Sequence, residues 1–511
     1  MKRTMTSTIL VLVFVSLLTQ TATAQHLHPT DTSADHSTPQ EATSTAQQGD
    51  AVLQWNQVLQ RAVRVPGAQP PTIRVERSYA MMHAAMFDAV NSIERAFKPY
   101  FVEVRASRGA SAQAAAAQAA YDILVALYPR QQETFDAELA ASLAGIPPGR
   151  ARQGQAVGHL IAQRILAWRS TDGWDATPPP FSLPPDPGNW QPTPPAFSPP
   201  TLTNWPAVVP FALSSSAQFR PPPPLPLTSA RYAADFNETK ELGAAGSTKR
   251  TADQTLVARL WASVGTPTGP INVSNNVARD VALARGTTLV EQARLFALLN
   301  IALHDALETA VASKFHYGLW RPVTAIRRAE EDGNPETIAD PNWSSLITNP
   351  PYPTYAGNAA TIGAASATVM ALVFGREDIS FDVYWEGAPG WTRSYTGFWE
   401  LADEQARSRV YGGIHFDFDG DAGQTVGRNV GNYVFLNFMR PRRGDRTTPT
   451  PGGWAKCADE GGFCDFDGTR RVRYGADGVY AYGTFAGGVE CSNAAFGDPL
   501  FGVAKSRDFE Q

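Results

Sequence analysis

The feature that most constrains this fold is an internal repeat of one amphipathic segment. Residues 294–310 align without gaps to residues 77–93, and the two segments share an arginine, two alanines and an Asp-Ala pair. Apolar residues face apolar residues at most other positions and recur at intervals of three and four, which indicates helices with one buried face. A repeated helix of this kind predicts two related helical bundles within one domain.

Helical patterns fill much of the chain around this repeat. Residues 110–128, 131–143 and 150–168 have the same periodicity. Residues 178–226 are instead dense in proline, and the Trp and Phe residues interleaved there favour a segment that packs onto the helices over a free linker. We therefore predict an all-α domain over residues 51–445, made of duplicated helical bundles with a Pro-rich wrapping segment.

Two segments at the N-terminus differ from the helical domain. Residues 1–24 combine Lys2 and Arg3 with a short apolar run and a small-residue cleavage site, which is typical of a signal peptide. We expect export to the periplasm or the medium, with no stable membrane insertion after cleavage. Residues 25–50 are rich in Thr, Ser, Gln, Ala and Asp, and this composition predicts a disordered leader.

Residues 446–511 are expected to form a small β-rich C-terminal module. They are rich in Gly, Thr and Asp, and residues 472–482 have a strand, turn and strand pattern. All three cysteines of the chain, Cys457, Cys464 and Cys491, lie in this segment. One disulfide is expected in an exported protein, and the sequence leaves open which two cysteines form it.

The overall composition bounds the kinds of partner. The chain has 43 Lys and Arg against 48 Asp and Glu, which gives a formal net charge of −5. The sequence contains no basic patch with interleaved aromatic residues, so nucleic acid is not an expected partner. It also lacks a Gly-rich phosphate loop, so nucleotide chemistry of the usual kinds is not expected.

Three cationic residues and one histidine occur at suggestive spacing in the second half of the chain. Six residues separate Lys314 from Arg321, and five separate Arg409 from His415. The three cations can surround one point, and guanidinium groups suit planar or tetrahedral oxyanions. His415 is the neutral nitrogen donor of the set, able to attack or ligate the central atom of such an anion. This pattern predicts a phosphate-like or vanadate-like site.

A Pro-rich turn and an Ala/Gly-rich helical pattern lie between these two pairs. A helix that begins near Asn358 would aim its free backbone N–H groups at the same anion. Outside this spacing, such a lysine, arginine and histidine set would more often be surface charge and a structural histidine.

The spacing resembles that of the vanadium-dependent haloperoxidases and the acid phosphatases of the type-2 phosphatidic acid phosphatase superfamily. Their pattern is K-x6-RP, then PSGH, then SR-x5-H. The first and third parts match in full, at Lys314, Arg321, Pro322, Ser408, Arg409 and His415. Asp419 matches the carboxylate that orients the imidazole in this family. The sequence around both motifs is similar to bacterial haloperoxidase-like members in particular.

The middle part of the pattern departs from the family. In the ungapped register, Gly357 stands in place of the serine and Ala359 in place of the acid–base histidine. A shift by one residue would set Ala356 against the serine and Asn358 against the histidine. Neither register supplies an imidazole, so the acid–base step of the family has no obvious donor here.

The resemblance implies a secreted vanadate-dependent haloperoxidase-like enzyme that oxidises halide with hydrogen peroxide and acts on a small organic acceptor. Vanadate, or phosphate in its place, would be held by Lys314, Arg321, Gly357, Asn358, Arg409 and His415. His415 would be the axial metal ligand, and His415, Asp419 and Arg409 the catalytic residues. Two alternatives are a phosphomonoester hydrolase with His415 as its nucleophile and a non-catalytic oxyanion-binding protein.

Three other histidines could be either structural or functional. Asp88 and Asp305 recur in the repeat, with His83 and His304 near them. We expect buried polar groups that bond between helices rather than a metal site, because no HExxH-type or paired-carboxylate spacing accompanies them. His316 is the remaining candidate for an imidazole that lines the oxyanion site, provided that its helix turns it inward.

Overall fold

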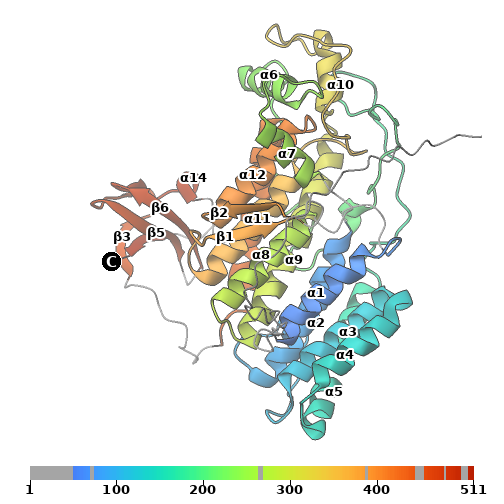
Figure 1. Cartoon of the computed structure of the whole chain (residues 1–511). Helices are drawn as coiled ribbons and strands as arrows, with labels where there is room; N and C mark the ends of the chain where they lie inside the picture. The colour runs from blue at the N-terminus through green and yellow to red at the C-terminus, as the bar shows by residue number, and fades with distance from the viewer. Residues whose placement is uncertain are drawn as a thin grey trace, which may run out of the picture. The chain divides into compact units, whose positions relative to one another are not determined.

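A computed structural model describes residues 50–68, 74–262, 269–385, 390–442, 454–476, 479–496 and 505–510. The predicted signal peptide (residues 1–24) and all but the last residue of the predicted leader (25–50) lie outside the described residues. Within them, the fold is all-α with a small β-rich C-terminal region (Figure 1), which confirms the predicted fold class.

The first half of the chain supplies the first helical bundle and the start of the second. Its helices are α1 (Ala51–Arg64), α2 (Val75–Glu94), α3 (Ala112–Leu127), α4 (Gln132–Leu143), α5 (Pro148–Arg169), α6 (Ala230–Gly243) and α7 (Ala252–Trp261). Short 3-10 turns are η1 (Pro129–Gln131) and η2 (Trp205–Ala207). The three helical segments predicted between residues 110 and 168 correspond to α3, α4 and α5.

The second half supplies the helices that surround the candidate site. They are α8 (Pro270–Ala284), α9 (Leu289–Tyr317), α10 (Pro322–Arg327), α11 (Asn358–Phe374), α12 (Phe398–Tyr411) and α13 (Asp417–Asn437), with the 3-10 turn η3 (Ala329–Glu331). A two-stranded hairpin, β1 (Phe381–Tyr384) with β2 (Thr392–Tyr395), follows α11 and was not expected from the sequence.

The internal repeat is preserved in the tertiary structure. The two repeated segments lie within α2 and α9, which pack against each other. Asp88 of α2 accepts hydrogen bonds from the backbone N–H groups of residues 100, 101 and 102, at 2.7, 2.9 and 2.7 Å. Asp305 of α9 does the same for residues 211, 212 and 213, at 2.8, 2.6 and 3.0 Å. The prediction that both aspartates are satisfied is confirmed, but their partners are loop backbones rather than other helices.

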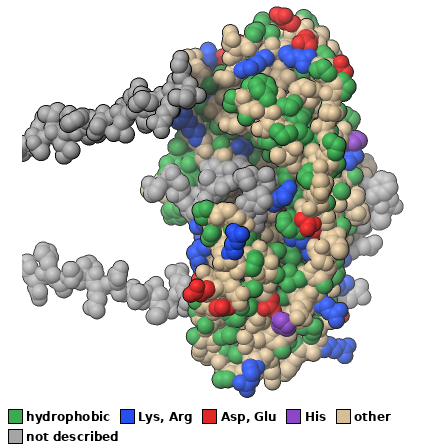
Figure 2. Space-filling view, turned by 90° about the vertical axis from the view of Figure 1, so that its right-hand side faces the viewer, with side chains coloured by type: hydrophobic (Ala, Val, Ile, Leu, Met, Phe, Trp, Pro, Cys, Tyr) green, Lys and Arg blue, Asp and Glu red, His purple; other side chains and the backbone are tan. Residues whose placement is uncertain are grey.

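The Pro-rich segment packs onto the helices through part of its aromatic set. Trp190, Trp205 and Phe211 are buried, as predicted, whereas Phe197 is 62% exposed. Because Asp305 holds the backbone at residues 211–213, this segment is fixed to α9 by hydrogen bonds as well as by apolar contact. Figure 2 shows one face of the molecule, on which acidic and basic side chains are interspersed among apolar ones.

Helix α9 forms the centre of the core. Among the described residues it is the helix long and apolar enough to cross a membrane, and that apolar stretch is entirely buried inside the fold. A capping box between Thr288 and Glu291 begins the helix. Gly318 ends it with a φ of +61°, and a Cβ there would lie 2.4 Å from the Leu183 side chain. A glycine is therefore needed at this C-cap, directly after the turn that carries Lys314.

The C-terminal region is β-rich, as predicted. Strands β3 (Trp454–Asp459), β8 (Ser506–Glu510), β5 (Thr469–Ala476) and β6 (Val479–Ala486) form an antiparallel sheet in that order. Strands β4 (Phe463–Cys464) and β7 (Val489–Glu490) pair separately, and α14 (Asn493–Phe496) follows. The predicted strand–turn–strand over 472–482 is the β5–β6 hairpin. The disulfide joins Cys457 to Cys464, and Cys491 is buried outside it.

Candidate oxyanion site

Four separate segments bring the candidate residues together. Lys314 lies in the last turn of α9 and Arg321 caps the N-terminus of α10, because Gly318 reverses the chain between them. Arg409 lies near the end of α12, and His415 follows in the loop that leads into α13. Helix α11 packs against α9, α12 and α13, so its N-terminus at Asn358 faces the same region.

Lys314 and Arg321 are buried cations tied to the backbone around the site. The Lys314 ammonium donates to the carbonyl oxygens of Thr354, at 2.6 Å, and of Ala356. Arg321 donates through Nε to the Tyr352 carbonyl at 2.9 Å and through Nη1 to the Ile414 carbonyl at 2.9 Å. Its Nη2 is buried and has no hydrogen-bond partner among the described residues. One N–H face of Arg321 is therefore open to a ligand.

Arg409 presents a second open donor. Its Nη2 donates to the carbonyl of Trp261, while its buried Nε meets no partner in the part of the chain that the structure describes. Burial lowers the pKa of Arg321 to about 10 and that of Arg409 to about 10, so both stay charged at neutral pH. Burial and the charge of Arg321 hold the pKa of the Lys314 amine well below its ordinary value. An anion between these groups would relieve their repulsion.

His415 is held in a defined tautomer. Its Nδ1 lies 3.0 Å from Asp419 Oδ2 and 3.0 Å from Thr354 Oγ1, while Thr354 donates its own hydroxyl hydrogen to Asp419 Oδ2 at 2.6 Å. Arg321 Nη1 approaches His415 Nε2 at 3.3 Å. Because a guanidinium can only donate, Nε2 must carry the lone pair and Nδ1 the proton. The ring nitrogen on the Arg321 side, Nε2, is therefore the one whose lone pair can act as a ligand or nucleophile.

The electrostatic environment of His415 and Asp419 keeps the His415 imidazole neutral. Burial, followed by the charges of Arg321, Lys314 and Arg409, lowers the pKa of His415 well below its ordinary value. Burial also raises the pKa of Asp419 to about 6, against the hydrogen bond from Thr354 and the charge of Lys314. Thr354 was missed by the sequence analysis. The only signal for it was a hydroxyl residue inside the Pro-rich turn before α11.

At the N-terminus of α11, Gly357 differs from the expectation that it binds the anion. The Gly357 N–H donates to the backbone oxygen of Asp419 at 2.8 Å, so it is already occupied. Asn358 is the first residue of the helix and is 9% exposed. Neither atom of its side-chain amide has a partner in hydrogen-bond geometry among the described residues. Ala359 is buried beside it and has no polar side-chain atom.

Two further residues were placed by the structure. His316 is exposed, whereas Lys314 is fully buried. Two residues on a helix are about 200° apart around the axis, so His316 points away from the site and cannot supply the missing imidazole. Tyr352 was not expected at the site from the sequence. Its ring centroid lies 5.1 Å from the Arg321 guanidinium and 5.6 Å from the Lys314 ammonium.

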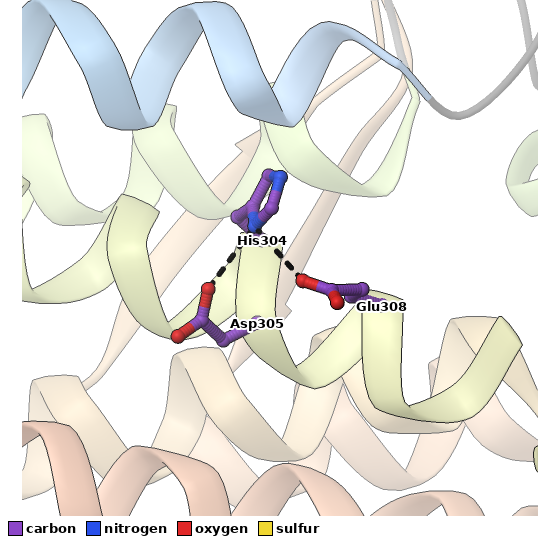
Figure 3. A group of neighbouring side chains, drawn as sticks. All are labelled: His304, Asp305 and Glu308. Atoms are coloured by element: carbon purple, nitrogen blue, oxygen red, sulfur yellow. Dashed lines mark hydrogen bonds and ion pairs between the residues drawn. The ribbon is translucent and has the colours of Figure 1, made fainter. Parts of the chain in front are cut away.

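A second polar cluster lies in the middle of α9, before Lys314 in the chain and outside this site (Figure 3). His304 Nδ1 is 3.1 Å from Asp305 Oδ1 and 3.8 Å from Glu308 Oε2, and all three residues are buried. Asp305 already uses both oxygens for the three backbone N–H groups described above. Both oxygens of Glu308 lack a hydrogen-bond partner among the described residues. Burial and the neighbouring Asp305 raise the pKa of Glu308 well above its ordinary value.

We expect Glu308→Gln to stabilise the protein at high pH. Because the folded-state pKa of Glu308 is raised, its carboxyl group destabilises the fold progressively as pH rises above the unfolded value of about 4.3. Glutamine has the same shape and no charge. Melting temperatures of the two proteins should therefore be close at pH 5, and the variant should melt higher by a margin that grows towards pH 9. Glu133→Gln, at an exposed position, is the control. A margin that shrinks as pH rises would contradict this account.

The comparisons with known proteins agree with this geometry. Residues 294–444, which contain every candidate site residue, match the family model of the VCPO second helical-bundle domain. The chain is 26% identical over 280 residues to the vanadium chloroperoxidase of Curvularia inaequalis, an alignment that spans 42% of this chain and 45% of that relative. It thus spans less than half the length of the curated protein.

Solved structures with the same fold cover more of the chain. The crystal structure of the first bacterial vanadium-dependent iodoperoxidase has a TM-score of 0.65 and 24% identity, over 77% of this chain and 97% of that one. A holo-type bacterial vanadium-dependent chloroperoxidase has a TM-score of 0.57 and 17% identity, over 73% and 94%. At these identities the likeness shows the fold.

Proposed function

We propose that this chain, a member of the superfamily of vanadium-dependent haloperoxidases, is an exported enzyme that binds vanadate and oxidises halide with hydrogen peroxide. One observation carries the proposal. Two buried guanidinium groups with unpartnered N–H donors lie around a neutral histidine whose Nε2 carries the lone pair and faces Arg321 Nη1 at 3.3 Å. This donor set fits a tetrahedral oxyanion whose central atom also accepts a nitrogen ligand.

The residues of the chain divide the work of binding and orientation. Arg321 Nη2 and Arg409 Nε would donate to oxygens of the anion, and the Lys314 ammonium would add a compact positive charge. Asp419 and Thr354 hold the His415 ring and its tautomer, so Nε2 remains directed at the anion. Bound vanadate would supply the Lewis-acid chemistry that makes hydrogen peroxide reactive towards halide.

Phosphomonoester hydrolysis is the second candidate, because the same donors fit phosphate and His415 Nε2 has the lone pair of a nucleophile. That reaction needs an acid to protonate the leaving group, and neither Gly357 nor Ala359 supplies one. A non-catalytic oxyanion-binding protein needs only the cations. Assays with hydrogen peroxide and bromide or iodide, with and without vanadate, beside a phosphomonoester assay separate the three. Vanadate-independent hydrolysis without halide oxidation would overturn the leading proposal.

We expect halide oxidation to be slow. Its pH profile should show the titration of Asp419, whose pKa is raised to about 6, without the second inflection that a further histidine would add near pH 6 to 7. Ala359→His should raise the rate about a hundredfold, the lower end of what a positioned acid–base group contributes. Adding Gly357→Ser should help little, because a Cβ there would lie 3.0 Å from the backbone oxygen of Asp419. Asn358→His tests the shifted register, and His316→Ala is the control. A second wild-type inflection, beyond that of Asp419, that survives His316→Ala would show that another group transfers the proton.

A further inference from the structure

We infer that the Tyr352 hydroxyl and the Asn358 side-chain amide bind the oxyanion directly and select anions that carry a proton. This inference rests on the proposed function, since it assigns residues to the same site. Neither residue belongs to the cationic motifs. Together they would supply neutral hydrogen bonds in a site that contains the His415 imidazole but lacks a second, acid–base imidazole.

Tyr352 lies at the boundary between the buried cations and solvent. Lys314 and Arg321 are fully buried, whereas Tyr352 is only partly buried. Its ring lies 5.1 Å from the Arg321 guanidinium and 5.6 Å from the Lys314 ammonium, and its backbone oxygen accepts from Arg321 Nε at 2.9 Å. Tyr352 is thus held next to the two cations both by its backbone oxygen, which accepts from Arg321, and by its ring, which contacts both cations. An anion that reaches those cations must come close to this tyrosine.

The hydroxyl of Tyr352 lies close enough to the same charged groups for them to affect its pKa. Burial raises the pKa of the phenol, and the charges of Arg321 and Arg409 together with the Asn358 amide oppose that rise, while Glu76 adds to it. The phenol therefore remains protonated at neutral pH and can donate a hydrogen bond. The Asn358 amide is close enough to act on this hydroxyl, although the two groups are outside hydrogen-bond geometry.

The amide of Asn358 is the second part of the inference. A buried amide with neither atom paired destabilises the fold, so such groups usually have a ligand or water. Here the amide sits at the start of α11, beside a phenol that responds to both arginines. A carboxamide has a donor and an acceptor. Its Nδ2 can donate to an anionic oxygen, while its Oδ1 can accept only from an anion that bears an O–H group.

This pairing predicts a class of ligand. Phosphate and vanadate are partly protonated near neutral pH and can donate to the Asn358 oxygen. Sulfate has no proton to donate and would meet that oxygen with repulsion. We therefore expect the wild-type protein to bind phosphate at least about tenfold more tightly than sulfate, the value of one hydrogen bond made against one opposed. The three cations alone would not distinguish the two anions to this extent.

Isothermal titration calorimetry with phosphate and with sulfate, at pH 7 and fixed ionic strength, tests the assignment. Tyr352→Phe keeps the ring and should weaken phosphate binding about tenfold, the value of one hydrogen bond to a charged group. Asn358→Leu removes donor and acceptor and should abolish the preference for phosphate over sulfate. Asn358→Asp adds a negative charge and should abolish binding of both anions.

Matched controls separate this inference from the proposed function. Tyr384→Phe changes an exposed tyrosine and should leave both affinities unchanged. Lys314→Met should weaken both anions and leave their ratio unchanged. If wild-type protein binds neither anion, the proposed function fails. If it binds phosphate but Tyr352→Phe and Asn358→Leu keep its affinity and its preference, the cationic site stands and this inference is wrong. Circular dichroism of each variant checks that the fold is retained.

Discussion

His415→Ala should lower vanadate affinity at least about a hundredfold, because losing groups that merely support a metal ligand already costs tenfold to a hundredfold. Phosphate affinity should change by less than about tenfold, because phosphorus is not coordinated by the ring and the arginine donors remain. The asymmetry follows from the tautomer, since Asp419 and Thr354 hold the proton on Nδ1 and leave the Nε2 lone pair inside the site. Halide oxidation should be lost with vanadate affinity.

Competition calorimetry with the two anions measures this asymmetry directly. His316→Ala is the matched control, since it removes an imidazole from the exposed side of α9 near the same lysine. Equal losses of vanadate and phosphate would show that His415 supports the site without ligating its central atom. The vanadate affinity of Asp419→Asn should lie between those of the wild type and His415→Ala. The ring would remain, but it would no longer be held in its orientation by the carboxylate.

Asp305→Ala should reduce the free energy of unfolding by about 3 to 5 kcal/mol, and Asp88→Ala should do the same. Each change leaves three buried backbone N–H groups without their acceptor, and one unsatisfied group costs about 1 to 3 kcal/mol before relaxation and water entry reduce the sum. Because the two aspartates make equivalent sets of bonds, their losses should be similar.

Urea denaturation followed by circular dichroism measures both variants. Asp175→Ala, at an exposed position, is the control and should change stability by less than about 0.5 kcal/mol. Asp305→Asn keeps one acceptor oxygen and should recover part of the loss. If Asp88→Ala is severe and Asp305→Ala is neutral, the two halves of the repeat do not share this structural role.

The sequence was sufficient for the fold class, which depends on local periodicity, and for the convergence of the motif residues, which depends on fixed spacing. Lys314, Arg321, Arg409 and His415 converge as expected from their motifs. The partners of Asp88 and Asp305 could not be predicted, because they depend on the paths of two loops. His316 could have been excluded in advance, since a helical step of two residues turns a side chain to the opposite face.

The roles of Thr354, Tyr352 and Asn358 required the three-dimensional arrangement. Thr354 joins His415 to Asp419 across 61 and 65 residues of sequence, and nothing in the local sequence marks this contact. Tyr352 acts through its position over two cations that come from other elements. Asn358 looked like a variant of a lost motif, whereas its unpaired amide suggests a use of its own.

The positive charges around His415 also determine which dissolved forms of a metal can reach it. Imidazole is a common ligand for zinc and copper, which enter protein sites as hydrated cations. Here three neighbouring cations repel such ions and attract anions. Together with burial, which has the larger effect, they hold the pKa of His415 well below its ordinary value. We therefore expect His415 to accept a metal that arrives as an oxyanion. We expect the abundant divalent metals to be disfavoured by the sign of their charge, before coordination geometry or ligand preference has any effect.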